Sequence, residues 1–317
     1  MIQPEEAASY IEPLHMNNMD GRMLYLPPKR QKREILVIYG HHSSLERWWG
    51  LVQSFNDFGA VTMPDLPGFG GMDSFYKIGR QATLDNYADY MAAFVKMRYK
   101  RKKVTIVGIS FGFLVATRML QRYPELSKRV DILVSAMGFM HNNNFVFSRT
   151  RFNSYRYLAE VVSLPPFPIV FRYTALVAPV LRTFYSRTNN AKHKFAYGKD
   201  NAEVQKAIMD IEVDLWQNND VRTYMRTTVE MFTVDHTAKK VDLPVWHVHT
   251  ANDNYFDNTI IEQQMRVVFN DFHPVPLNVK SHAPSVVATK KEASDFVPVE
   301  LRKILRSKYP SQRVVKK

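Results

Sequence analysis

The stretch KKVTIVGISFGFLVATRML, residues 102–120, decides the fold, because a β-branched run changes within a few residues into a helical pattern. Residues 103–110 are typical of a buried strand, and residues 110–123 predict a helix that stops at Pro124. Gly-x-Ser-x-Gly lies at their junction, with Ser110 at its centre. A serine on a sharp strand-to-helix turn exposes its hydroxyl above the sheet, and small flanking residues let neighbouring backbone approach. The junction therefore predicts a nucleophilic serine.

Short β-branched runs alternate with longer amphipathic runs along most of the chain. This alternation is typical of parallel strands joined by crossover helices, and it predicts an α/β fold with a mostly parallel central sheet flanked by helices. Further strands are expected over residues 33–40, at the start of 59–73, and over 130–139, 243–253 and 274–282; helices are expected over 45–59, 83–100, 259–270 and from about 286 to 307.

Residues of about 140–232 break the alternation. They begin with a polar and aromatic stretch, continue through a Pro-rich apolar segment, and end in two helical patterns that meet near residues 218–220. An insertion of this length without strand signals is best explained as a helical cap over the catalytic face. We therefore expect a core formed by residues 1–139 and 233–317 and a helical cap or lid formed by residues 140–232.

Composition limits the classes of protein that this chain can belong to. Its 317 residues, 45% of them hydrophobic, suffice for a large core, and the absence of cysteine excludes disulfides, thiol nucleophiles and cysteine-bound metals. The net charge is +13, with basic clusters at 27–33, 98–103 and 308–317. These clusters indicate either solvated faces or an anionic partner such as an acidic membrane surface. No helix-turn-helix or RNP-like pattern accompanies them, so no nucleic acid partner is expected.

Two segments bear on the cell compartment. The first residues, MIQPEEAASYIEP, carry two glutamates where a secretory signal has a basic region, and they are not followed by an apolar run. The most apolar stretch, residues 161–185, is interrupted by four prolines and two arginines, which is unfavourable for a membrane-spanning helix. We expect a cytoplasmic protein, with peripheral membrane contact left open.

The order of four motifs resembles the α/β-hydrolase family over nearly the whole chain. YGHHSS (39–44) follows an early strand, DLPGFGGMD (65–73) the next, GISFG (108–112) forms the nucleophile elbow, and a late Asp and a late His follow later strands. In that family the catalytic triad runs Ser, then Asp or Glu, then His. The resemblance implies a triad of Ser110, Asp253 in HTANDNYFD and His282 in VKSHAP.

The chemistry requires these residue types because a serine hydroxyl is a poor nucleophile until a neutral imidazole accepts its proton and a carboxylate orients that imidazole. Among the histidines, His282 lies just past a late strand, whereas His247 and His249 lie inside a strand and are expected to be structural. Asp253 ends a strand, whereas Asp257 is placed as a helix cap. Some relatives place the acid after the preceding strand, but residues 135–144 contain no carboxylate.

The resemblance also implies an oxyanion hole formed by the backbone N–H groups of His41 and Phe111. Tyr39 stands where this family usually has histidine, but a backbone donor does not depend on that side chain. Adjacent histidines such as His41 and His42 rarely chelate one ion without further ligands, so no metal and no other cofactor is expected. Asp65 is interpreted as a turn residue, and the glycines that follow it as turn-forming residues and not as a phosphate cradle.

A serine nucleophile implies an acyl-enzyme, and the residues of the cap indicate the substrate. Aromatic side chains crowd residues 145–185, which favours a small apolar ester with an aliphatic or aromatic acyl group; Phe145, Phe167 and Phe171 are candidate substrate contacts. Hydrolysis of an amide or of a carbon–carbon bond next to a carbonyl stays open. So does a catalytically silent binding protein of the same fold, associated with an anionic membrane surface.

Overall fold

The structure is a computed structural model that describes residues 4–187, 195, 200–251, 253–279 and 282–307. Its centre is an eight-stranded sheet in the order β1-β2-β4-β3-β5-β6-β7-β8. From β4 onward neighbouring strands are parallel, whereas β1 and β2 pair antiparallel with each other and β2 antiparallel with β4. The strands are β1 (Ile11–Met16), β2 (Met19–Leu26), β3 (Arg33–Ile38), β4 (Gly59–Pro64), β5 (Val104–Ile109), β6 (Val130–Ala136), β7 (Val241–Thr250) and β8 (Phe269–Leu277). The predicted α/β class with a mostly parallel sheet is confirmed.

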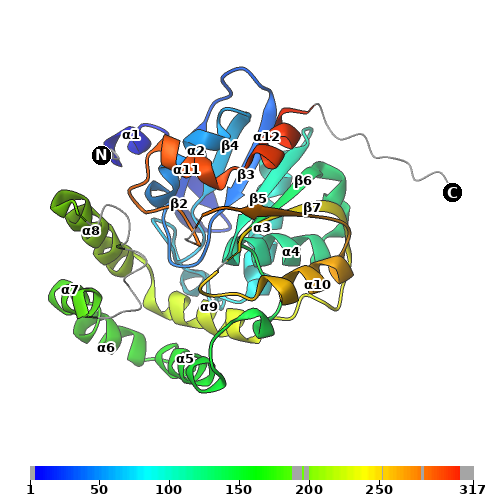
Figure 1. The fold of residues 1–317 in the computed structure, drawn as a ribbon. Helices are drawn as coiled ribbons and strands as arrows, with labels where there is room; N and C mark the ends of the chain where they lie inside the picture. Colours follow the sequence, from blue (N-terminus) through cyan, green and yellow to red (C-terminus); the bar gives the residue numbers. More distant parts are fainter. Residues whose placement is uncertain (1–3, 188–194, 196–199, 252, 280–281, 308–317) are drawn as a thin grey trace.

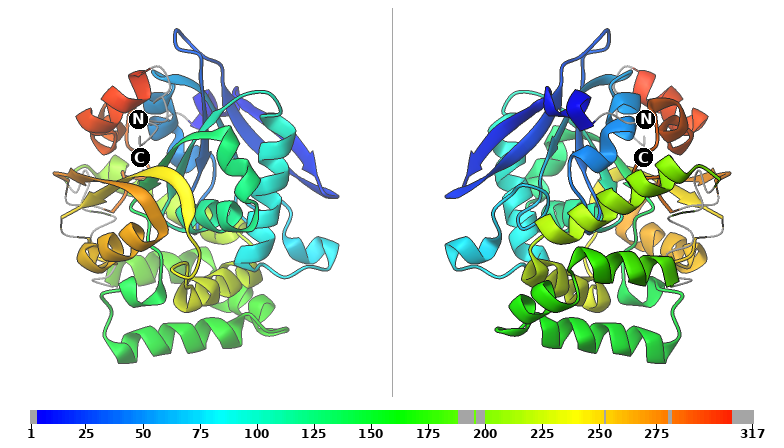
Figure 2. Two further views of the ribbon diagram at one scale, coloured as in Figure 1. Left: turned by 90° about the vertical axis from the view of Figure 1, so that its right-hand side faces the viewer. Right: turned by 90° about the vertical axis from the view of Figure 1, so that its left-hand side faces the viewer.

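Helices cover both faces of the sheet, so the central strands are buried along their whole length (Figure 1). One face carries α2 (Trp49–Phe55), α11 (Lys290–Ala293) and α12 (Val299–Arg306), and the other carries α3 (Leu84–Arg98), α4 (Phe111–Arg122) and α10 (Asn258–Val268) (Figures 1 and 2). Among the residues that the structure describes, short 3-10 helices join these elements at Glu46–Trp48, Phe75–Ile78, Pro124–Arg129, Asn142–Asn144 and Ser294–Phe296.

Two local features differ from the sequence predictions. The hairpin β1–β2, preceded by the short helix α1 (Pro4–Ala8), was not predicted; its turn places Asn17 and Asn18 at φ of 54° and 60°, the left-handed backbone that a two-residue hairpin turn requires. The single helix expected from about residue 286 to 307 is instead α11, a 3-10 turn and α12. The break falls before Pro298, because proline disfavours helical backbone at the residue that precedes it.

Between β6 and β7 the chain forms five helices without a strand among the described residues, here called the helical insertion: α5 (Arg149–Val162), α6 (Phe167–Thr174), α7 (Ala178–Arg187), α8 (Ala202–Asn218) and α9 (Val221–Thr233). These helices lie apart from the sheet (Figure 1) and share their own apolar cluster, to which α5, α8 and α9 contribute side chains such as Val162, Val213 and Val229. The basic segment 308–317 lies outside the described residues.

The parallel register brings the carboxyl ends of the central strands to one edge. Ile38 of β3 pairs with Gly108 of β5, and Ile109 pairs with Ala136 of β6. Ala136 pairs in turn with Val248 of β7. In open parallel sheets ligands bind at this edge, so the loops that follow β3, β5, β7 and β8 are the ones to inspect.

Buried histidines predict how stability depends on pH. Burial lowers the pKa of His41 and His236 to about 4 and that of His247 to about 3. The unfolded chain therefore binds three protons at pH 5 that the folded chain does not. Burial also raises the pKa of Asp65 to about 6, so this carboxyl is protonated in the folded state at pH 5 and loses its proton on unfolding. The net uptake is about two protons, so the free energy of unfolding should fall by roughly 2 to 3 kcal/mol between pH 6 and pH 5.

Urea unfolding followed by circular dichroism between pH 5 and 8 measures this slope. His236→Gln should reduce this slope by about half, since one proton fewer is taken up on unfolding. A free energy of unfolding that does not change between pH 6 and 5 would contradict the buried neutral state of these rings.

Candidate active site

Ser110 occupies a strained turn between β5 and α4. Its backbone has φ 50° and ψ −114°, a conformation that residues with a side chain rarely adopt. The turn is held by two backbone hydrogen bonds: the Ser110 N–H donates to the Ala136 carbonyl (2.9 Å) and the Phe113 N–H donates to the Ser110 carbonyl (2.9 Å). Ser110 is partly exposed although β5 is fully buried. The turn thus presents the serine at the carboxyl edge of the sheet.

The glycines on both sides of Ser110 are required by close backbone contacts. A Cβ atom on Gly112 would lie 2.0 Å from the Ile38 carbonyl oxygen, and one on Gly108 would lie 2.6 Å from the Phe113 Cα. Both distances are far below a permitted carbon contact. The glycines therefore let β3 and the first turn of α4 pack directly against the elbow, as the sequence motif indicates.

Asp253 and His282 form a hydrogen-bonded pair beyond the ends of β7 and β8. The Nδ1 atom of His282 lies 2.6 Å from Oδ2 of Asp253, and the two side chains are 16% and 2% exposed. Oδ1 of Asp253 accepts hydrogen bonds from the N–H groups of Tyr255 (2.8 Å) and Phe256 (3.3 Å). Burial raises the pKa of Asp253, but the His282 ring and these two N–H groups outweigh that effect and hold the pKa below its ordinary value. The carboxylate is therefore ionised and orients the imidazole.

His282 lies on the same side of the sheet edge as the elbow. A small apolar cavity is lined both by His282 and by Ile109, the residue before Ser110, together with Ala136, Met137 and Val248 from the neighbouring strands. No hydrogen bond joins Ser110 Oγ to the His282 ring among the described residues. In structures without substrate such bonds are often long and shorten only in the reactive complex.

Two backbone segments, the start of α4 and the loop that follows β3, lie close to Ser110. The Phe111 N–H belongs to the first turn of α4, where helical N–H groups have no partner within the helix. Gly40, at the start of the loop that follows β3, lies so close to the elbow that a Cβ atom on it would be 3.5 Å from Ser110 Cβ and 3.3 Å from the Ile109 carbonyl oxygen. His41 follows directly. The two predicted oxyanion donors thus come from the two segments that approach the serine.

The rings of His41 and His42 contact the helical insertion through different partners. His41 Nε2 lies 2.8 Å from Thr227 Oγ1 and 3.2 Å from the Tyr224 carbonyl, which can only accept, so Nε2 carries a hydrogen. The His42 ring packs on Trp216 with ring centroids 4.1 Å apart. Among the described residues no group of three or more His, Cys, Asp or Glu side chains could hold a metal ion.

The other polar residues singled out from the sequence have structural partners. His247 lies within β7 with Nδ1 2.9 Å from Ser135 Oγ, and Asp257 caps α10 by accepting from the N–H groups of Thr259 and Ile260. Asp65 is more than a turn residue, because its side chain is fully buried and forms an ion pair with Arg22. It also accepts hydrogen bonds from the Tyr39 hydroxyl (2.9 Å) and from the Gly71 N–H (2.9 Å). It therefore fixes the loop 65–71 against β2 and β3.

The three candidate substrate contacts lie in different places. Phe145 stacks on Phe232 (4.8 Å) and packs on Phe256 (5.0 Å), whose ring is 5.4 Å from that of His282. Phe171 packs against the apolar cluster of the insertion, and Phe167 is 47% exposed. Of the three candidates, only Phe145 is connected to the candidate triad by described ring contacts, through Phe256 and then His282.

Sequence reasoning missed the residues that follow Asp253. The Tyr255 and Phe256 N–H groups bind the Asp253 carboxylate, and their rings lie 5.2 Å and 5.4 Å from that of His282. The signal was present in HTANDNYFD, because aromatic residues two and three positions after a candidate acid can enclose the histidine that this acid binds.

Known proteins resemble this chain in sequence and in fold. An uncharacterized protein of Mycobacterium tuberculosis is 27% identical over 237 residues, which cover 69% of this chain and 64% of that protein. The cis-3-alkyl-4-alkyloxetan-2-one decarboxylase of Shewanella oneidensis is 26% identical over 119 residues, or 38% of this chain and 37% of that enzyme. The chain thus matches less than two thirds of the length of either relative.

Solved structures of low sequence identity share the fold. An esterase from Thermogutta terrifontis superimposes with a TM-score of 0.61 at 15% identity, covering 94% of this chain and 98% of that one. A hydrolase from Oleispira antarctica gives a TM-score of 0.64 at 11% identity, covering 90% and 94% of the two chains. Residues 29–269 match the family described as serine aminopeptidase, S33. With the elbow at Ser110 and the sheet order described above, the chain belongs to this family of α/β-hydrolases.

Proposed function

We propose that this protein is a serine hydrolase that cleaves a carboxylic ester with an apolar acyl or aromatic group through an acyl-enzyme. The observation that carries the proposal is the strained turn at Ser110 at the same sheet edge as the His282–Asp253 pair. A strained, partly exposed serine at the same sheet edge as an oriented imidazole is typical of an activated nucleophile, and a purely structural role does not require it.

In the proposed mechanism Ser110 Oγ attacks the ester carbonyl while His282 Nε2 accepts its proton. Asp253 keeps the Nδ1 hydrogen in place and stabilises the imidazolium that forms. The N–H groups of Phe111 and His41 stabilise the oxyanion of the tetrahedral intermediate. His282 then protonates the leaving alkoxide, leaving an acyl group on Ser110. Water activated by the same ring releases the acid and regenerates the serine.

The surroundings of the site support an apolar substrate. Phe139, Phe145 and Phe256 form an aromatic group beside His282, and the helical insertion places Trp216 and Tyr224 against the loop that follows β3. Apolar and aromatic walls with few polar groups are typical of pockets for hydrophobic small molecules. We therefore propose that the insertion acts as a cap over the site and selects for an apolar acyl group.

Two alternatives remain in view. The family is described as an aminopeptidase, so an amide is the first competitor to an ester. A catalytically silent binding protein is the second, and it is favoured by one observation: the described contacts include no hydrogen bond between Ser110 and His282. Both alternatives are separated from the proposal by direct tests of Ser110 and Asp253.

Replacing Ser110 tests the nucleophile. Ser110→Ala should abolish labelling by a fluorophosphonate probe and lower kcat on nitrophenyl esters of short and medium acyl chains by roughly 10⁴-fold or more. The matched control is Ser135→Ala, since Ser135 also lies near the end of a neighbouring strand but is bound to His247. Unlabelled wild-type protein that also fails to hydrolyse the esters would overturn the proposal. Preferential cleavage of aminoacyl nitroanilides would favour the amide alternative.

Replacing Asp253 tests the orientation of the imidazole. Asp253→Asn keeps the shape of the side chain but should lower kcat by roughly 10³ to 10⁴-fold with little change in KM, because the amide no longer favours the productive tautomer. Asp257→Asn is the control, because asparagine caps a helix about as well as aspartate. Steady-state kinetics of both variants provide the measurement. Equal activity of the Asp253 variant and the wild type would remove Asp253 from the mechanism.

A further inference from the structure

The exposed apolar side chains of this protein gather on one part of the helical insertion. Of the fifteen large apolar side chains that are exposed among the described residues, ten lie between residues 155 and 184, on α5, α6, α7 and their connections. We call the most exposed of them the outer apolar face: Tyr157, Leu164, Ile169, Val170, Tyr173 and Phe184. A concentration of this kind on one segment marks an interaction surface, whereas single exposed apolar residues elsewhere require no explanation.

The same helices are already packed on their inner side. Val162 of α5 and Leu181 of α7 are buried in the apolar cluster that the insertion shares with Val213 and Val229 of α8 and α9. The outer apolar face is therefore a second apolar surface on helices whose folding is satisfied without it. Helices that are apolar on both sides are normally covered on both sides.

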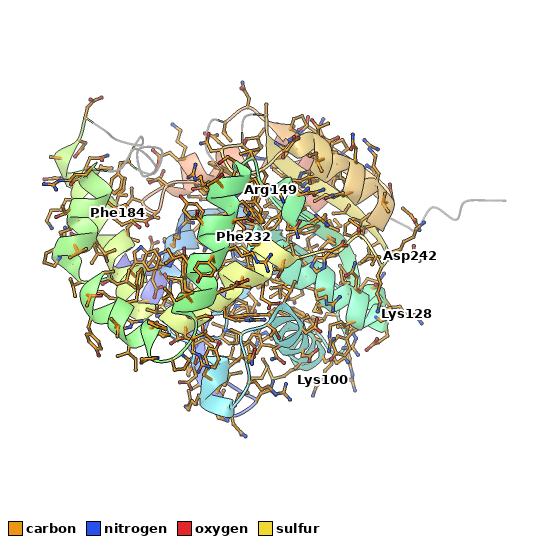
Figure 3. The ribbon with its side chains drawn as sticks, turned by 90° about the horizontal axis from the view of Figure 1, so that it is seen from below. Lys100, Lys128, Arg149, Phe184, Phe232 and Asp242 are labelled. Atoms are coloured by element: carbon orange, nitrogen blue, oxygen red, sulfur yellow. The ribbon has the colours of Figure 1, made fainter. Side chains whose placement is uncertain are left out.

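The figures show where the helices that carry this surface lie. In Figures 1 and 2 the helices α5, α6 and α7 form the lower boundary of the molecule, on the side of the insertion away from the sheet. Figure 3 views the molecule from that side: α5, α6 and α7 lie toward the viewer, with Phe184 of α7 and Arg149 of α5 in different parts of the insertion. Nothing of the core lies over these helices in this view.

Charge indicates the chemistry of the occupant. Residues 149–187 contain six arginines and a single glutamate, in a chain whose net charge is +13. Some of these arginines are paired within the protein, as Arg156 is with Glu160 and Arg182 with Asp210, but Arg149 and Arg187 at the two ends of the segment are exposed. An apolar face on a segment with an exposed arginine at each end complements an anionic lipid surface. Two copies of this basic face would instead repel each other.

The lengths of α6 and α7 and the bend between them determine whether they can cross a bilayer or only lie on its surface. Among the described residues no single helix has the length and apolarity to cross a membrane; α6 and α7 reach both only when taken together, and they are bent by 75°. With 8 and 10 residues each helix is roughly 12 to 15 Å long, about half of a hydrocarbon core. Such helices can lie in the interface, where tyrosine is a preferred residue.

We propose that the outer apolar face docks on the surface of an anionic phospholipid bilayer, with Ile169 and Val170 entering the acyl boundary and Arg149 and Arg187 at the headgroups. The arrangement places the helical insertion against the membrane and leaves the core in water. Docking does not depend on the hydrolase activity proposed above, so the two are tested separately.

Vesicle flotation with the whole chain tests the docking directly. Wild-type protein should float with vesicles of equal parts phosphatidylcholine and phosphatidylglycerol, and less with phosphatidylcholine alone. Ile169→Asp combined with Tyr173→Asp should lower the partition coefficient on the mixed vesicles by about tenfold or more. Both positions are strongly exposed, at 64% and 73%, so these changes leave the folded core intact.

The matched control carries the same two charges elsewhere. Val267→Asp combined with Val299→Asp replaces apolar residues that are 54% and 59% exposed on α10 and α12, and this variant should float like the wild type except for a small effect of net charge. Arg149→Gln and Arg187→Gln should each weaken flotation on the mixed vesicles by about fivefold and have no effect on phosphatidylcholine alone.

Three outcomes overturn the proposal. The first is wild-type protein that does not float with the mixed vesicles. The second is an equal loss of flotation in the two aspartate double variants. The third is a wild-type dimer in sedimentation velocity that Ile169→Asp with Tyr173→Asp converts to a monomer, without any vesicle binding, because the face would then join two copies of the chain.

Discussion

The backbone turn at Ser110 is the constraint on which the rest of the site depends. Its positive φ costs on the order of 1 to 3 kcal/mol and persists only because the surrounding structure enforces it. Gly108 and Gly112 permit that enforcement, since any side chain at either position would collide with the first turn of α4 or with β3. The same close approach fixes where Gly40 and the β3 loop pass. The position of one serine thus determines the positions of both candidate oxyanion donors.

The candidate site is shared between the core and the helical insertion. His41 bonds to Tyr224 and Thr227 of α9 through its ring, and the N–H of Gly70 donates to the Asn219 side chain at 2.8 Å. Burial lowers the pKa of His41 to about 4, so the ring is neutral near pH 7, and in that state its Nε2–H donates to the Tyr224 carbonyl. A displacement of α9 would therefore be transmitted to the loop that carries one candidate oxyanion donor. The helices α5, α6 and α7, which carry the outer apolar face, form the part of the same insertion that lies away from the sheet (Figure 1).

Strong local signals explain what could be predicted from the sequence. The change from β-branched to helical pattern around Ser110 predicted β5, the elbow and α4, and the residues just past late strands identified Asp253 and His282, which the structure joins by a hydrogen bond. The catalytic roles of these residues remain predictions. Two features had local signals that hydrophobic periodicity does not detect. Pro298 marks the break before α12, and the pair Asn17–Asn18 is typical of a hairpin turn with positive φ.

Other features depend on tertiary packing and could not be read from one chain. Phe145 and Phe167 have the same side chain within one aromatic stretch, yet one packs beside Phe256 near His282 and the other is exposed. Asp65 was interpreted as a turn residue because its partners Arg22 and Tyr39 are 43 and 26 positions away in sequence. Neither periodicity nor spacing reports such contacts.

The acyl-enzyme is the central claim, and peptide mass mapping of a trapped intermediate tests it most directly. Protein mixed with an activated ester and quenched in acid within one turnover should carry one acyl group, located on the peptide that contains Ser110. Asp253→Asn should accumulate less of this adduct in the same time. Ester hydrolysis without an adduct on Ser110, or an adduct on another residue that turns over at the rate of product formation, would contradict the account.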